Sequence, residues 1–126
     1  MYFNKIHHVA IIVSDYERSR KFYVEQLELP VIRENYREDR EDWKLDLQVG
    51  DTELEIFGVK NPPKRVTDPE ACGLRHLAFH VEDVEQAVAW LNGKGIETEP
   101  IRWDAYTQKQ MVFFRDPDGL PIELHG

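Results

Sequence analysis

The sequence has few of the features that mark exported, membrane-spanning or nucleic-acid-binding chains. Its 126 residues include a single cysteine, Cys72, so no disulfide can form within the chain. No apolar run approaches the roughly 20 residues of a transmembrane helix, and the polar start MYFNK lacks a signal-peptide pattern. The net charge of −8 argues against binding to nucleic acid or to anionic membranes. We therefore expect a soluble, cytoplasmic protein with neither of these partners.

What the sequence does have is the composition of a globular protein. Hydrophobic residues make up 41% of the chain and charged residues 32%, which excludes extended disorder. A length of 126 residues suffices for one compact domain with a proper core. We therefore expect a single domain over residues 1–126.

A repeat divides the sequence into two similar halves. The stretch IHHVAIIVSD at residues 6–15 returns as LRHLAFHVED at residues 74–83, a shift of 68 residues. In each copy an apolar run predicts a strand, and the closing Asp stands where a helix N-cap belongs, because its carboxylate can accept from free backbone N–H groups. Such a repeat indicates a duplicated structural unit.

The remaining elements also occur in the same order twice. The first half predicts a helix at 16–29 and strands at about 31–37, 43–49 and 52–58. The second half predicts a strand at 74–81, a helix at 84–95, a strand near 96–101 and a hairpin of strands within 109–115 and 120–125. The result is an α+β fold of tandem βαβββ modules, at about 4–59 and 74–126, joined by a proline-containing linker at about 60–73. Neither module covers both faces of its sheet, so we expect curved mixed sheets that form a cleft.

Two histidines and two glutamates repeat with the modules. Glu55 follows His8 by 47 residues, as Glu123 follows His76 (55 − 8 and 123 − 76). Because side chains alternate along a strand, all four are expected on the sheet face away from the helix. A lone histidine on an apolar strand is usually a core or surface residue, but two equally spaced His–Glu pairs favour a metal site.

Two imidazoles and two carboxylates suit a borderline divalent cation such as Zn, Ni, Co or Mn. Four protein ligands leave two positions of an octahedron for water or substrate oxygens. A cation would also compensate the cost of burying a glutamate. The sequence therefore predicts a metal centre made by both modules.

The chain resembles the vicinal oxygen chelate superfamily, which includes glyoxalase I, fosfomycin-resistance enzymes, extradiol dioxygenases and bleomycin-resistance proteins. The resemblance covers nearly the whole chain and rests on HVAIIVSD, HLAFHVED and the closing DPDGLPIEL. It implies the tandem βαβββ fold. His8, Glu55, His76 and Glu123 each match a ligand position of bacterial glyoxalase I, which isomerises the hemithioacetal of methylglyoxal and glutathione.

This resemblance implies a lyase or isomerase for a small α-hydroxycarbonyl compound or thiohemiacetal. A metal that chelates two adjacent substrate oxygens acidifies the neighbouring C–H and stabilises the enediolate. Glu123 or Glu55 would then move the proton between the two carbons, and we favour Glu123. Glyoxalase I enzymes commonly place an arginine just past the first ligand histidine to hold glutathione. Ile11 and Ile12 stand there instead, so another thiol adduct, a small metabolite and an aromatic compound stay open as substrates.

Other members of the superfamily provide the alternatives. A ring-cleaving dioxygenase typically keeps two His and one Glu on Fe(II), which the second glutamate disfavours. Thiol transfer to an epoxide antibiotic is the second alternative, and the absence of a longer potassium- and phosphonate-binding loop counts against it. The third alternative is a non-enzymatic drug-binding protein of the bleomycin-resistance kind. Such proteins lack the metal ligands, so the four candidate ligands of this chain argue against it.

The substrate pocket and the assembly state are also expectations. Candidate pocket residues are His80, Phe57, Trp103, Tyr106 and Phe113. In the family this chain resembles, modules pair within one chain or between two, which implies a homodimer whose metal site lies within a chain or between subunits.

Overall fold

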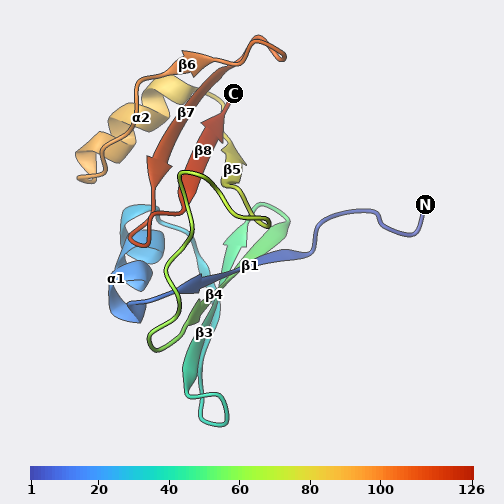
Figure 1. The fold of residues 1–126 in the computed structure, drawn as a ribbon. Coiled ribbons are helices and arrows are strands. Elements are labelled where there is room, and N and C mark those ends of the chain that lie inside the picture. Colours follow the sequence, from blue (N-terminus) through green and yellow to red (C-terminus); the bar gives the residue numbers. More distant parts are fainter. The chain divides into compact units, whose positions relative to one another are not determined.

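Each half of the chain forms one compact unit. The computed structural model describes residues 1–126, divided into Met1–Pro63 (unit 1) and Lys64–Gly126 (unit 2). Each unit has a four-stranded mixed sheet and one helical segment (Figure 1). The predicted α+β class and the βαβββ order are confirmed in both units. The module boundaries expected at about 4–59 and 74–126 stay predictions.

Unit 1 builds its sheet in the order β1-β4-β3-β2. Its elements are β1 (His8–Val13), α1 (Tyr16–Arg20), the π-helical segment η1 (Lys21–Gln26), β2 (Val31–Arg37), β3 (Asp42–Val49) and β4 (Thr52–Gly58). β1 pairs with β4 in parallel, and the other two pairings are antiparallel. Asp15 caps α1 as expected, because its carboxylate accepts from the backbone N–H of Arg18 at 3.2 Å.

Alternation along the strands separates the two faces of this sheet. Leu45 and Leu47 on β3, with Leu54 and Ile56 on β4, are buried. The neighbouring positions on the same strands carry the charged residues Lys44, Asp46, Glu53 and Glu55. Phe22 and Tyr23 of η1 are buried as well, so the apolar face is the one that the helical segment covers. We call the opposite, charged face the open face of the sheet.

Unit 2 repeats this plan with the order β5-β8-β7-β6. Its elements are β5 (Leu77–His80), α2 (Val84–Gly93), β6 (Arg102–Trp103), β7 (Gln110–Arg115) and β8 (Pro121–His125). Asp83 caps α2 through the backbone N–H of Gln86 at 3.1 Å. α2 packs against β7, and Val112, Phe114, Ile122 and Leu124 are buried.

Two sequence-based expectations about these elements are wrong. The strand near 96–101 is absent: that segment is irregular, and β6 has only two residues. Pro100 has no N–H to donate to a ladder, and only the N–H of Glu99 bonds to β7, at 2.9 Å from Phe113 O. The first helix was expected to reach residue 29, but it ends at Gln26 after widening to π-type turns. There the N–H of Leu27 bonds five residues back, to Phe22 O at 2.8 Å, and Glu28 has a left-handed φ of 58°.

The helices are short: α2, the longer of the two α-helices, has 10 residues. None has the length and apolar character needed to cross a bilayer.

Candidate metal centre

The first His–Glu pair lies on the open face of the unit 1 sheet. His8 begins β1, and Glu55 lies on the neighbouring β4, where its register partner is Ala10. Because parallel neighbours present corresponding side chains on one face, His8 Nε2 comes within 3.6 Å of Glu55 Oε2. The Glu55 side chain is only 14% exposed, so this carboxylate is largely removed from water.

The second pair occupies the corresponding place in unit 2. His76 directly precedes β5, and Glu123 lies on β8 with His76 Nε2 at 3.4 Å from its Oε1. The Glu123 side chain is 12% exposed. Phe113 is its antiparallel partner, and the Phe113 ring packs edge-on to His76 with centroids 5.2 Å apart. This carboxylate therefore lies beside an aromatic ring.

The second ring nitrogen of each histidine has a different neighbour in the two units. In unit 2 Arg75 Nη1 lies 3.1 Å from His76 Nδ1. Because a guanidinium can only donate, Nδ1 of His76 accepts in this contact. A metal ion on Nε2 would require the ring proton on Nδ1, and this contact would then be lost. In unit 1 His7 Nδ1 lies 3.0 Å from His8 Nδ1. Since imidazole can accept, His8 can carry its proton on Nδ1 and keep a lone pair on Nε2, as a metal ligand needs.

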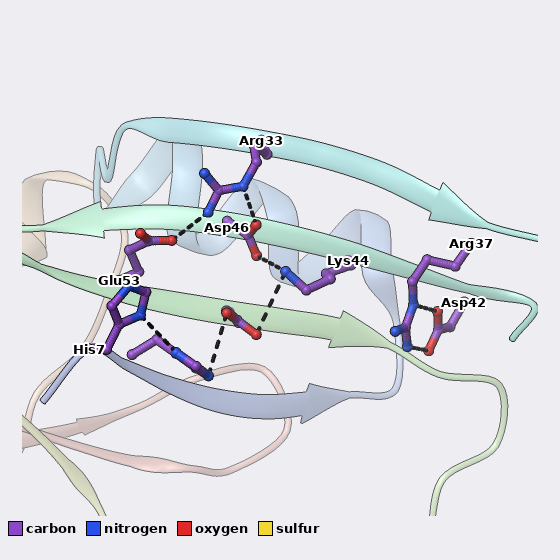
Figure 2. A network of polar contacts seen from close by, with 9 residues as sticks. His7, Arg33, Arg37, Asp42, Lys44, Asp46 and Glu53 are labelled. Carbon is purple, nitrogen blue, oxygen red and sulfur yellow. Dashed lines mark hydrogen bonds and ion pairs between the residues drawn. The ribbon is translucent and has the colours of Figure 1, made fainter.

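A row of ion pairs continues from the unit 1 pair across the open face (Figure 2). Lys44 Nζ lies 2.7 Å from Asp46 Oδ1 and 3.7 Å from Glu55 Oε1. Arg33 bridges Asp46 Oδ2 at 2.8 Å and Glu53 Oε1 at 2.6 Å. Burial raises the pKa of Asp46, but the bonds from Lys44 and Arg33 outweigh it and lower that pKa below its usual value. We call Glu53, Arg33, Asp46 and Lys44 the ionic row.

Two of the predicted pocket residues lie next to the pairs. Two cations of the open face lie over the ring of Phe57, with Arg37 Cζ 4.9 Å and Lys44 Nζ 5.8 Å from the ring centroid. Phe113 contacts His76, as described above. Both phenyl rings are half-buried and give the open faces an apolar component beside the polar groups.

The other three predicted pocket residues do not join these groups. His80 is exposed at the end of β5, with His125 as its register partner. Trp103 and Tyr106 are 68% and 97% exposed, on β6 and on the turn that follows it. Their place in a substrate pocket stays a prediction.

The sequence analysis missed a group of hydrogen bonds around Asp104 that stabilises this turn in unit 2. The Asp104 carboxylate accepts from the backbone N–H of Tyr106 at 2.8 Å and lies 3.1 Å from His125 Nε2. These contacts lower the pKa of Asp104, chiefly through the Tyr106 N–H, and Asp104 raises the pKa of His125. The ionic row was missed too, although alternation already placed Lys44 and Asp46 on the face of Glu55.

The donor atoms of each pair fit a divalent cation. Ligand atoms about 2.1 Å from one ion can lie up to about 4.2 Å apart, and the two pairs have separations of 3.6 Å and 3.4 Å. Imidazole nitrogen and carboxylate oxygen are donors that Zn, Ni, Co and Mn accept. The structure contains no group of three or more His, Cys, Asp or Glu side chains placed so that they could hold one metal ion. The four-ligand centre therefore stays a prediction, with one pair in each unit.

Comparison with known proteins identifies relatives over the full length of the chain. Residues 5–124 match the family model of the Glyoxalase/Bleomycin resistance protein/Dioxygenase superfamily. The uncharacterised protein YwkD of Bacillus subtilis is 55% identical, with 99% of this chain and 98% of YwkD covered. The crystal structure of a glyoxalase family protein from Enterococcus faecalis is 56% identical with a TM-score of 0.94, and both chains are covered completely, at 100%. Metallothiol transferase FosB of Staphylococcus epidermidis is 27% identical over 99% of this chain and 83% of its own length.

Proposed function

The chain belongs to the glyoxalase/bleomycin resistance protein/dioxygenase superfamily, and on that basis we propose that it is a divalent-metal-dependent lyase or isomerase. Its substrate would be a small α-hydroxycarbonyl compound or a thiohemiacetal. The observation that carries the proposal is the duplicated pair: one imidazole and one largely buried carboxylate meet at 3.6 Å in unit 1 and at 3.4 Å in unit 2.

His8, Glu55, His76 and Glu123 would hold the cation. When bound, Zn, Ni, Co or Mn would supply a Lewis acid that makes the C–H next to the substrate carbonyl more acidic. The carboxylate of Glu123 takes the proton from one substrate carbon and returns it to the next. No lysine or arginine forms an ion pair with Glu123, whereas Lys44 lies 3.7 Å from Glu55. Glu123 is therefore the carboxylate with more freedom to leave the ion and act as the base.

The half-buried rings of Phe57 and Phe113 would contact the apolar part of the substrate. Ile12, 62% exposed on β1, stands where glyoxalase I enzymes commonly bind glutathione through an arginine, so we propose a thiol other than glutathione or a thiol-free substrate. We also propose a homodimer, in which the pairs of unit 1 and unit 2 meet within one chain or across the interface. Size-exclusion chromatography of a monomer with full metal occupancy would exclude the shared site.

The test combines elemental analysis with an isomerase assay. We expect the purified protein to retain a divalent ion, and the protein reloaded with Zn, Ni, Co or Mn to isomerise the hemithioacetal of methylglyoxal and a low-molecular-weight thiol. A protein that retains none of these ions and stays inactive after reloading with each of them contradicts the proposal.

Thiol transfer is the second candidate, favoured by the similarity to FosB. Consumption of a thiol by an epoxide antibiotic, in place of isomerisation, would support it. Oxygen uptake with Fe(II) and a catechol would instead support a dioxygenase. The two glutamates make this the weaker alternative, because that chemistry needs more open positions on the metal.

A further inference from the structure

Lys44 is the member of the ionic row that forms an ion pair with Glu55 of the unit 1 pair; Figure 2 shows Lys44 beside Asp46. Its Nζ lies 3.7 Å from Glu55 Oε1, while the other oxygen of the same carboxylate, Oε2, lies 3.6 Å from His8 Nε2. Lysine and imidazole thus approach opposite oxygens of one carboxylate. An ion that binds between the histidine and the glutamate would use the oxygen that the lysine leaves free.

The ionic row can orient the Glu55 carboxylate without adding net charge to the open face. Arg33 and Lys44 contribute two positive charges, and Asp46 and Glu53 contribute two negative ones. Asp46 is 1% exposed and holds Lys44 at 2.7 Å, so the lysine amine is tied to a buried carboxylate with few alternative positions. Because breaking this arrangement would leave a buried charge with fewer partners, the amine is a fixed reference point for Glu55.

We infer that Lys44 is a positioning residue, which fixes Glu55 as a ligand through one oxygen and aims Oε2 at the ion shared with His8. This inference rests on the proposed metal-dependent function. In unit 2 the antiparallel partner of Glu123 is Phe113, where unit 1 has Asp46 opposite Glu55. Glu123 forms no ion pair with a lysine or arginine, which suits its proposed role as the base. The two glutamates therefore divide the work: one stays on the ion and one moves the proton.

Charge and orientation predict opposite results when Lys44 is removed. Lys44→Met makes the surroundings of the site more negative, so charge alone would tighten the binding of a cation. Loss of orientation would weaken binding, and outer partners of metal ligands typically contribute about 10–100-fold to affinity. The direction of the change therefore distinguishes the two effects.

The experiment measures the affinity of the metal-free, full-length protein for Co²⁺ by competition with a chelator, and records the visible spectrum of the bound ion. We expect Lys44→Met to bind Co²⁺ about 10–100-fold more weakly than the unsubstituted protein. The matched control is Arg37→Met. Arg37 pairs with Asp42 at 2.7 Å on the same face and makes no contact with Glu55, so its loss removes the same charge without the orientation. We expect that variant to bind Co²⁺ at least as tightly as the unsubstituted protein.

A double-mutant cycle tests whether Lys44 acts through Glu55. With Glu55→Gln in place, Lys44→Met should cause no further loss of affinity; with Glu123→Gln, it should cause the full loss. Circular dichroism verifies folding, and Lys44→Gln, which can still donate to Asp46, is used if Lys44→Met fails to fold. Unchanged or tighter Co²⁺ binding by the Lys44 variant, or additivity with Glu55→Gln, overturns the inference and leaves the proposed function intact. An unsubstituted protein that binds no Co²⁺, Zn²⁺, Ni²⁺ or Mn²⁺ overturns both.

Discussion

The two units share a backbone plan and differ in what their open faces carry. Asp46 stands opposite Glu55 in unit 1, and Phe113 stands opposite Glu123 in unit 2. The residue before the histidine of each pair differs as well: it is His7 in unit 1 and Arg75 in unit 2. The duplication preserved the donor pairs while the surroundings diverged. In unit 1 the Glu55 carboxylate lies among charged side chains, and in unit 2 the Glu123 carboxylate lies next to an aromatic ring.

This difference indicates how a duplicated site acquires two roles. A ligand that stays on the ion benefits from a fixed surrounding, whereas a base must move and is better without a competing cation. Neither role is visible in the spacing of the pairs, which is the same in both halves. The following experiments test whether the asymmetry has functional consequences.

The largest effect is expected for the base. Glu123→Gln should lower the turnover of the metal-loaded protein about 100–10,000-fold, since the amide cannot accept the proton. Glu55→Gln should mainly weaken metal retention and recover part of its turnover at high metal concentration. Isomerase assays over a range of metal concentrations separate the two effects, with circular dichroism as the folding control. A greater loss of turnover in Glu55→Gln at saturating metal would assign the base to unit 1 instead.

A large effect on stability is expected at the repeated core positions. Leu54 and Ile122 are 2% and 0% exposed and correspond in the repeat. Replacing either by Ala should lower the free energy of unfolding by about 2–5 kcal/mol, because each leaves a cavity. Urea unfolding measures the loss, and Ile12→Ala, at a position 62% exposed, is the control with little expected change. Losses well below 1 kcal/mol at either buried site would show that this unit is loosely packed.

A smaller effect is expected at the position before each histidine. Arg75→Leu should tighten Co²⁺ binding by about 1 kcal/mol, the net worth of one hydrogen bond, because His76 can then carry its proton on Nδ1 and offer Nε2 to the ion. His7→Leu should weaken binding, since His8 loses the partner of its Nδ1–H. Chelator competition measures both. The same direction of change in the two variants would contradict the difference between the units.

The smallest effect is expected in acid. In unit 1 the Arg20 and Arg37 guanidinium groups hold the pKa values of Glu34 and Asp42 below their usual range. Such groups contribute stability above their unfolded pKa values, 4.5 for Glu34 and 3.8 for Asp42, which is lost as the pH falls through the folded ones. In unit 2 the pKa of Asp104 is lowered as well, but chiefly by the backbone N–H of Tyr106 and not by a guanidinium. Hydrogen exchange measured from pH 6 to about pH 3 should therefore show unit 1 losing protection first, and Arg37→Met should reduce the difference. Earlier loss in unit 2 would contradict this order.

Much of the fold could be predicted from local signals. The strand at 31–37 coincides with β2, and Asp15 and Asp83 cap their helices as expected, because capping depends only on neighbouring residues. The prediction of a strand near 96–101 was wrong. The apolar ends of this segment suggested a strand, but Pro100 has no N–H to donate and the segment lacks a ladder partner, so it is irregular. The widening of the first helix at η1 was missed for a similar reason: π-type bonds have no distinct sequence pattern.

The sequence by itself determined the duplication, the α+β class and the two His–Glu pairs, because these depend on periodicity and spacing along the chain. Only the tertiary structure decided which groups surround each pair. Strand register brings Lys44 to Glu55 and Phe113 to Glu123, and residues far apart in sequence acquire those neighbours only when the strands align. The candidate metal-donor residues could therefore be identified from the sequence, whereas the difference between their surroundings arises only in the folded structure.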